Sequence, residues 1–239
     1  MAYAHREPRP SARAARLLLP LALLALAGPM SGCGRSPTGD GTDRVNGSIH
    51  VAAGVPSSAA ATVNGSIVAD DNAVLKSART VNGGISIGAN ARAESLTTVN
   101  GPVTLKPGAH VSGAVTVVNG SVNLSEGAEV SATVTNVNGK IALNDAHVAG
   151  GIVTVNADIS VLGNSRVEGG ITVKKPSGLF FHVSDAVPQI IIGPGAIVQG
   201  NLRFEHKVAL YVSDHATVGP IIGATAIPFS GPTPPAPTP

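Results

Sequence analysis

The sequence predicts an all-β protein, a three-sided, single-stranded parallel β-helix (β-solenoid) with about 18 residues per coil. Three observations predict this fold. A tripeptide recurs at a nearly constant interval, the apolar residues after each copy alternate with a period of two, and the composition favours strands over helices.

The Val-Asn-Gly repeat sets the length of one coil. Successive copies are 18 or 19 residues apart, starting at Val45, Val63, Val81, Val99, Val118 and Val137, with a variant Val-Asn-Ala at Val155. An apolar residue follows two positions after each copy. Strand alternation then predicts that Val99, Val103 and Leu105 share the inner side of a strand, while Asn100 lies on the outer side. Stacked copies would bury a column of aliphatic side chains.

A second motif, half a repeat later, predicts the other sides of the coil. It reads Leu-Lys-Pro-Gly-Ala-His-Val at 105–111, Leu-Ser-Glu-Gly-Ala-Glu-Val at 124–130 and Ile-Gly-Pro-Gly-Ala-Ile-Val at 192–198. An aliphatic residue, a turn and an Ala-x-Val run are typical of a chain that bends after every few residues. We expect regular coils over 45–173, and irregular final coils with an aromatic cap over 174–230, where the pattern frays.

The composition explains how such a core is built and excludes several classes of function. Of 239 residues, 43% are hydrophobic but only 3% aromatic, so the core must consist of Val, Ile, Leu and Ala. The single cysteine excludes a disulfide framework and a thiolate zinc cluster. Residues 33–239 contain 12 Lys and Arg and 13 Asp and Glu, which gives a net charge of −1. A nearly neutral body offers no electrostatic case for binding nucleic acid.

Residues 1–32 have the layout of a secretory signal peptide, with four arginines before an apolar run at 17–27 that is too short to span a bilayer. Met30-Ser31-Gly32-Cys33 resembles the lipobox of bacterial lipoproteins. The resemblance implies cleavage before Cys33, acylation of Cys33 and anchoring in the cell envelope, and Gly34 after the cysteine points to the outer membrane. Residues 33–44 are expected to be a lipidated N-terminus and flexible linker, and 231–239 a Pro-rich disordered tail.

Over residues 45–224 the three-sided repeat resembles that of the bactofilins, bacterial β-solenoid proteins that polymerise into scaffolding filaments. The Thr-Val-Asn-Gly copies are also similar to repeats in adhesin-like domains of bacterial surface proteins. The first resemblance implies a scaffold that self-associates into homo-oligomers or polymers. The second implies a rod that binds an envelope glycan or another surface.

Two groups of residues are candidates for these roles. The asparagines of the repeat would form either a structural ladder of stacked amides or a polar strip that grips a glycan; they are Asn46, Asn64, Asn82, Asn100, Asn119, Asn138 and Asn156. The aromatic residues of the last third would form either a cap on the core or a surface on which two rods meet; they are Phe180, Phe181, Phe204 and Tyr211.

The histidines raise the alternative of a trimeric hexapeptide-repeat acyltransferase-like enzyme. His110 and His147 occupy the same outward phase of the Ala-x-Val motif, two coils or roughly 9–10 Å apart at the spacing of paired strands. That distance is too long for both to bind one zinc ion. Charged residues share the same column, so a solvated ladder of mixed charge is expected there. We therefore expect no catalytic site, no metal and no cofactor.

The leading expectation is a non-enzymatic, lipid-anchored β-solenoid of the cell envelope that acts as a scaffold or interaction surface. One form of such a scaffold would self-associate through its ends. An adhesin or glycan-binding rod is the second expectation, and the hexapeptide-type enzyme is the third. The expected partners are the membrane through the lipid, further copies of the chain and an envelope glycan.

Overall fold

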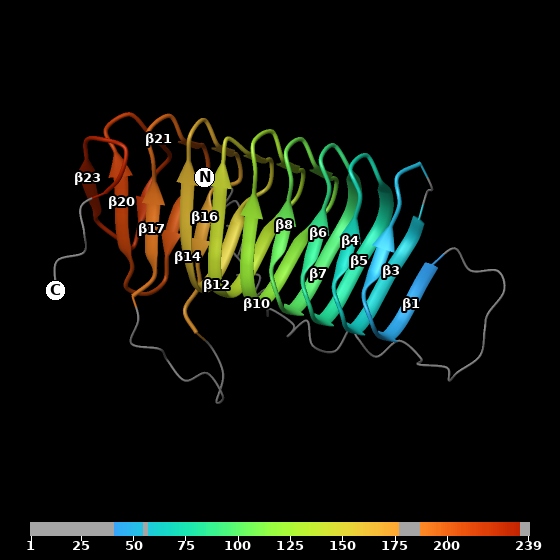
Figure 1. Ribbon diagram of the computed structural model, residues 1–239. Coiled ribbons are helices and arrows are strands. Elements are labelled where there is room, and N and C mark those ends of the chain that lie inside the picture. The colour runs from blue at the N-terminus through green and yellow to red at the C-terminus, as the bar shows by residue number, and fades with distance from the viewer. Residues whose placement is uncertain (1–40, 55–56, 177–186, 235–239) are drawn as a thin grey trace, which may run out of the picture. The chain divides into compact units, whose positions relative to one another are not determined.

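The computed structural model of the chain describes residues 41–54, 57–176 and 187–234. These residues belong to one compact unit, Asp40–Pro239, and form a parallel β-solenoid of about 10 coils (Figure 1). None of the residues in these ranges is helical, and equivalent strands stack about 18 residues apart. The predicted fold class is confirmed. No helix within the described ranges is long and apolar enough to cross a membrane.

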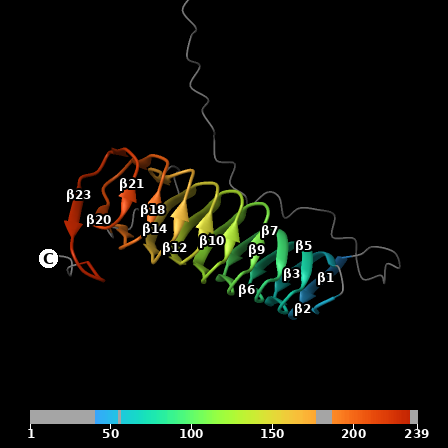
Figure 2. The same ribbon diagram turned by 90° about the horizontal axis from the view of Figure 1, so that it is seen from above.

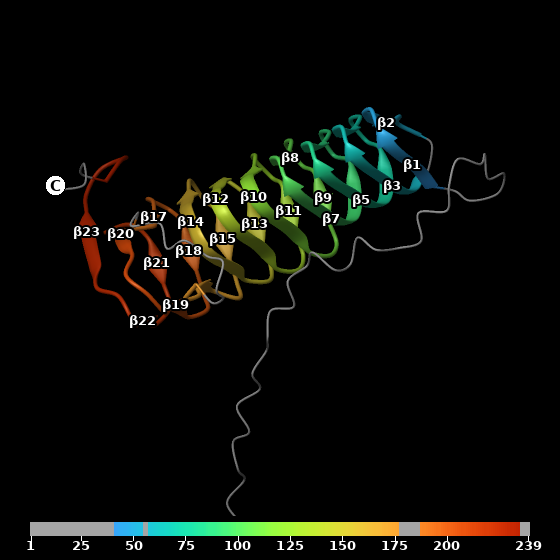
Figure 3. The ribbon, with the colours of Figure 1, turned by 90° about the horizontal axis from the view of Figure 1, so that it is seen from below.

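The strands form three faces, here called A, B and C. Face A consists of β1 (Gly41–Asn46), β3 (Ser57–Asn64), β5 (Val74–Asn82), β7 (Arg92–Asn100), the first parts of β10 (Val115–Leu124), β12 (Val134–Asn144) and β14 (Ile152–Leu162), then β16 (Ile171–Val173), β19 (Leu202–Phe204) and β22 (Ile221–Ile222). Views from above and below show the same coils in Figures 2 and 3.

Face B follows face A within each coil, across the Val-Asn-Gly corner. It consists of β2 (Ile49–Val51), β4 (Ile67–Ala69), β6 (Ile85–Ile87), β8 (Val103–Leu105), the second parts of β10, β12 and β14, then β17 (Gln189–Ile192), β20 (Ala209–Ser213) and β23 (Ala226–Phe229).

Face C closes each coil and carries its shortest strands. It consists of β9 (His110–Val111), β11 (Glu129–Val130), β13 (His147–Val148), β15 (Arg166–Val167), β18 (Ile197–Val198) and β21 (Thr217–Val218), together with the first residues of β5 and β7. Figure 3 shows these short strands stacked side by side.

The core is a set of aliphatic columns, because the register places the same kind of residue at the same position in every coil. On face B one inward column runs through Ile49, Ile67, Ile85, Val103, Val122, Ile141, Ile159, Ile190 and Leu210. All of these side chains are buried. β-Branched residues suit such stacking, since their side chains are stiff and pack well on a pleated surface. A core of this kind needs few aromatic rings.

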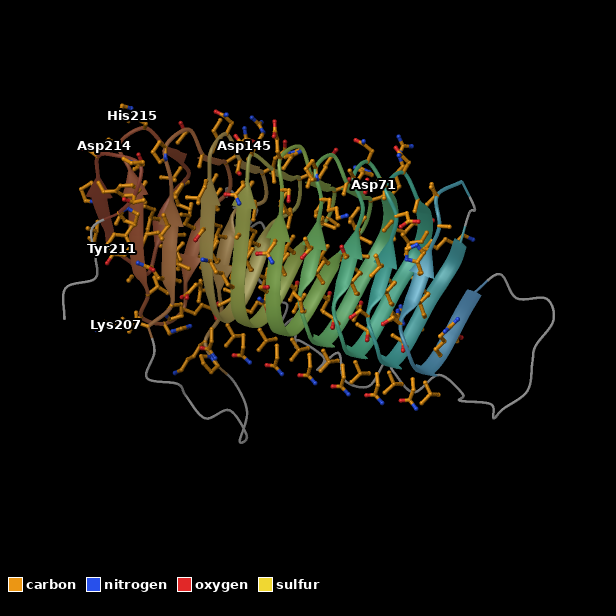
Figure 4. The ribbon with its side chains drawn as sticks, in the orientation of Figure 1. Asp71, Asp145, Lys207, Tyr211, Asp214 and His215 are labelled. Carbon is orange, nitrogen blue, oxygen red and sulfur yellow. The ribbon has the colours of Figure 1, made fainter. Side chains whose placement is uncertain are left out.

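A turn of defined type joins faces B and C. In one coil Ala109 N donates to Lys106 O at 3.0 Å and Gly108 has a φ of 69°. Pro107 precedes it, which is the type II pattern of Pro followed by a left-handed residue. Asn72 and Asp145 supply the left-handed residue in other coils. Asp71 and Asp145 both lie on this ridge of turns (Figure 4), where each carboxylate accepts a backbone N–H from the next coil.

The corner between faces A and B differs from the simple alternation expected from the sequence. Thr98, not Val99, points inward: it is fully buried, and its Oγ1 donates to Gly83 O of the preceding coil at 2.9 Å. Val99 is half-buried on the outer side. The prediction for Val99 is wrong because the chain bends at Asn100 and Gly101, and the period of two does not carry across a bend.

Two predicted boundaries also need correction. The linker was expected to end at residue 44, but β1 begins at Gly41 and pairs with β3, so residues 41–44 already belong to the first coil. Residues 174–230 were expected to form irregular final coils with an aromatic cap. Instead, β17, β18 and β19 pair in register with β14, β15 and β16, so regular stacking is present again from Gln189.

One buried polar residue offers a route to higher stability. Asn136 takes the corner position that Thr98 holds two coils earlier, and its Nδ2 donates to Gly120 O at 3.0 Å. Its buried Oδ1 has no hydrogen-bond partner in the described part of the chain. We expect Asn136→Thr to raise the free energy of unfolding by about 1 kcal/mol, because threonine keeps a donor there without the orphaned carbonyl. Urea denaturation measures the difference.

The reverse change provides the control. Thr98→Asn introduces the amide into a coil where threonine already satisfies Gly83 O, and it should lower the free energy of unfolding. A destabilised Asn136→Thr variant would contradict the account.

Candidate functional site

The asparagines of the repeat form one continuous ridge, here called the Asn ridge. The Nδ2 of each residue donates to the Oδ1 of the asparagine in the preceding coil, with six bonds of 2.9 to 3.2 Å linking Asn46, Asn64, Asn82, Asn100, Asn119, Asn138 and Asn156. The corner turns these side chains away from the core, and most of them are exposed. The last bond of the ridge joins Asn156 to Asn138.

The ladder leaves part of each amide free. An asparagine amide has two N–H donors and an oxygen with two lone pairs. The ladder uses one N–H and one lone pair of a central residue such as Asn100. One N–H and one lone pair per coil therefore remain for solvent or for a ligand, so the ridge can be structural and adhesive at once.

We expect Asn100→Ala to lower the free energy of unfolding by about 1–2 kcal/mol, since it removes one donated and one accepted hydrogen bond. Asn46→Ala is the matched control, because Asn46 lies at the end of the ladder and only accepts one bond, from Asn64. Asn46→Ala should lower the free energy of unfolding by about half as much as Asn100→Ala does. Equal losses for the two variants in chemical denaturation would show that the ladder adds nothing.

A column of charged residues runs along face C. The strand register aligns Arg92, His110, Glu129, His147 and Arg166. Glu129 separates the two histidines: its Oε2 lies 3.2 Å from His110 Nδ1, and its Oε1 lies 3.7 Å from His147 Nδ1. His147 Nε2 also lies 3.2 Å from the carboxylate of Glu168.

The contacts of this column are exposed pairs of polar and charged side chains. A hydrogen bond from Arg166, followed by one from His147, holds the pKa of Glu168 below its ordinary value. The side chains in these pairs are about two-fifths exposed; they are His110, Glu129, His147, Arg166 and Glu168. Such pairs contribute little to the stability of the fold because water and salt screen them. In the described ranges no three His, Cys, Asp or Glu side chains are grouped to hold a metal ion. The column is a solvated ladder of mixed charge.

Of the four predicted aromatic residues, the structure describes Phe204 and Tyr211. Phe180 and Phe181 lie outside the described residues, as does Cys33. Phe204 is 5% exposed and belongs to the hydrophobic core on face A. Tyr211 is equally buried, on face B (Figure 4). Phe204 therefore packs at the end of the core and offers no ring to a second rod.

The two ends of the solenoid carry features that sequence reasoning missed. In β1, Arg44 takes the inward position that Thr62 holds in the next coil, and it is exposed. In β23, Asp214 N donates to Phe229 O, so the backbone of Pro228 faces away from β20, toward an edge that no described strand covers. Inward charges and edge prolines hinder the addition of further strands. Only the position at an end gives these residues this role, and the sequence does not mark it.

Comparisons with known proteins leave the function to be argued from this geometry. No family model, no curated protein and no solved structure matches the chain. The two polar columns, the end strands and the fold itself are therefore the features that bear on function.

Proposed function

We propose that this chain is a non-enzymatic, lipid-anchored β-solenoid of the bacterial cell envelope that presents its long sides as an interaction surface. Stacked repeats create extended binding surfaces because each coil adds one more copy of the same residues. A rigid stack of equivalent coils suits the display of a repeated surface.

The observation that carries the proposal is the contrast between the sides and the ends. On one side, the Asn ridge runs unbroken through seven consecutive asparagines. The end strands instead carry Arg44 and Pro228, which hinder strand addition. Recognition along the sides is therefore favoured over end-to-end polymerisation.

Photo-cross-linking in cells tests the contrast. A photoreactive amino acid replaces Ser86 on face B, Asn100 on the Asn ridge or Asp43 in the end strand β1, in otherwise unchanged full-length protein. We expect cross-linked partners from Ser86 or Asn100 and none from Asp43. A regular series of multimers of the chain from Asp43 would instead favour end-to-end assembly and reject the proposal.

The lipid anchor is tested separately, at Cys33. Cells fed an alkyne-bearing fatty acid should label the wild-type protein and not Cys33→Ala, and only the labelled protein should partition into the detergent phase. Label that persists in Cys33→Ala would reject acylation at this residue, while leaving the interaction surface to its own test.

The spare amide groups of the Asn ridge favour a second function, binding of an envelope glycan. Amide N–H and C=O groups pair well with sugar hydroxyls. Purified envelope polysaccharide should then bind the full-length protein saturably. The double variant Asn82→Ala and Asn119→Ala should weaken binding, whereas His110→Ala on face C should not. Equal binding by both variants would exclude the ridge as the site.

A further inference from the structure

The outer side of face A carries a second regular pattern, here called the Thr/Val array. In four consecutive coils, β7, β10, β12 and β14, two outward positions per strand hold a hydroxyl or a methyl group. The array consists of Thr97, Thr116, Thr135 and Val153 in one column and Val99, Val118, Val137 and Val155 in the next. All eight side chains are half-buried, and the register keeps them in line.

The array is stiff and carries no charge. Threonine and valine are β-branched, so few side-chain rotamers are open to them and little entropy is lost on binding. The nearest charged residues in the Thr column are Arg79, one coil before the array, and Arg203, beyond Thr172. A third outward column lies on the other side of the Thr column, and in β7 it holds the small residue Ser95. A neutral, rigid ligand fits this surface better than a charged or flexible one.

The strand geometry sets the spacing of the array. Successive coils lie about 4.8 Å apart, and alternate residues of one strand lie roughly 6.6 Å apart. The eight residues therefore form a grid of two columns and four rows that covers on the order of 200 Å². A stable protein interface buries about 800 Å² per partner, so the grid is too small for a second copy or another protein to hold by itself.

We propose that the Thr/Val array binds the ordered water of an ice surface. The prism faces of hexagonal ice repeat in two perpendicular directions at distances close to those of the grid. Threonine hydroxyls can take the places of lattice oxygens, and the methyl groups of both residue types fill the gaps between them without displacing hydrogen bonds. A crystal offers no charge that needs a partner, and the array supplies none.

The inference is independent of the proposed lipid anchor and of a glycan at the Asn ridge, because it uses the outer side of face A alone. The test uses the full-length protein in a neutral detergent, with the detergent as the blank. The measurements are the gap between the melting and freezing points of a single ice crystal and the shape of that crystal. The wild-type protein should open a gap and shape the crystal into facets.

Two matched variants locate the effect. Thr116→Lys places a charged side chain in the middle of the grid and should abolish the gap. Thr104→Lys makes the same change at an outward, half-buried threonine of face B and should keep it. Thermal unfolding of both variants shows whether the solenoid remains folded.

Three results would overturn the inference. The first is a wild-type protein that neither opens a gap nor shapes ice at any concentration. The second is equal activity in folded Thr116→Lys and in the wild type, which would place ice binding elsewhere. The third is a dimer in light scattering that Thr116→Lys dissociates, which would assign the array to a second copy.

Discussion

Gly120→Ala is expected to lower the free energy of unfolding by about 3 kcal/mol, because the added methyl group has no room. A Cβ on Gly120 would lie 2.1 Å from the carbonyl oxygen of Gly101 in the preceding coil. The obstacle is backbone, so it cannot move aside as a flexible side chain can. Relief requires the two coils to separate, and this weakens the strand pairing on both sides of the corner. Urea denaturation of the purified variant measures the loss.

Gly47→Ala is the matched control. Gly47 holds the same place in the first Val-Asn-Gly copy, and a Cβ there would meet nothing within 4 Å. Its φ of 106° disfavours alanine, so this variant measures backbone strain without crowding. Gly120 has no such φ. A loss at Gly120 no larger than the loss at Gly47 would show that contact between coils is not the reason for glycine in the repeat.

Ile141→Ala is expected to cost about 4 kcal/mol, the second large effect. Ile141 is fully buried in the inward column of face B, between Val122 and Ile159. Truncation leaves a cavity that the neighbouring coils cannot fill, because hydrogen bonds between coils hold their spacing. The free energy of unfolding from denaturation and the melting temperature should both fall.

Ile49→Ala makes the same change at the start of the same column. Ile49 is 2% exposed, and among the described residues it pairs with Ile67 alone. In a stack, a terminal coil has one interface and an internal coil has two, so the loss should be about half that at Ile141. If the order of the two losses were reversed, coil-to-coil packing would not be the main source of stability.

The length of the coil and the contents of its columns could be predicted from the sequence. Equal spacing of Val-Asn-Gly aligns identical residues when coils stack, so the asparagine column and the column of His110, Glu129 and His147 follow from counting. The type II turn with Pro107 and Gly108 is likewise local chemistry that its residues specify. The sequence could not predict that Thr98 and not Val99 points inward, because the direction of each side chain depends on how sharply the corner bends.

The amino-acid sequence by itself determined that this chain stacks coils of about 18 residues around an aliphatic core, because repetition, strand propensity and turn chemistry all act within one coil. Only the tertiary structure decided which threonines turn inward, where the first coil begins, and that Arg44 and Pro228 lie at free edges. The tertiary structure likewise decided that the residues of the Thr/Val array lie side by side on the outer side of face A. These features depend on which residues become neighbours across coils, and that is settled only when the chain has closed each turn.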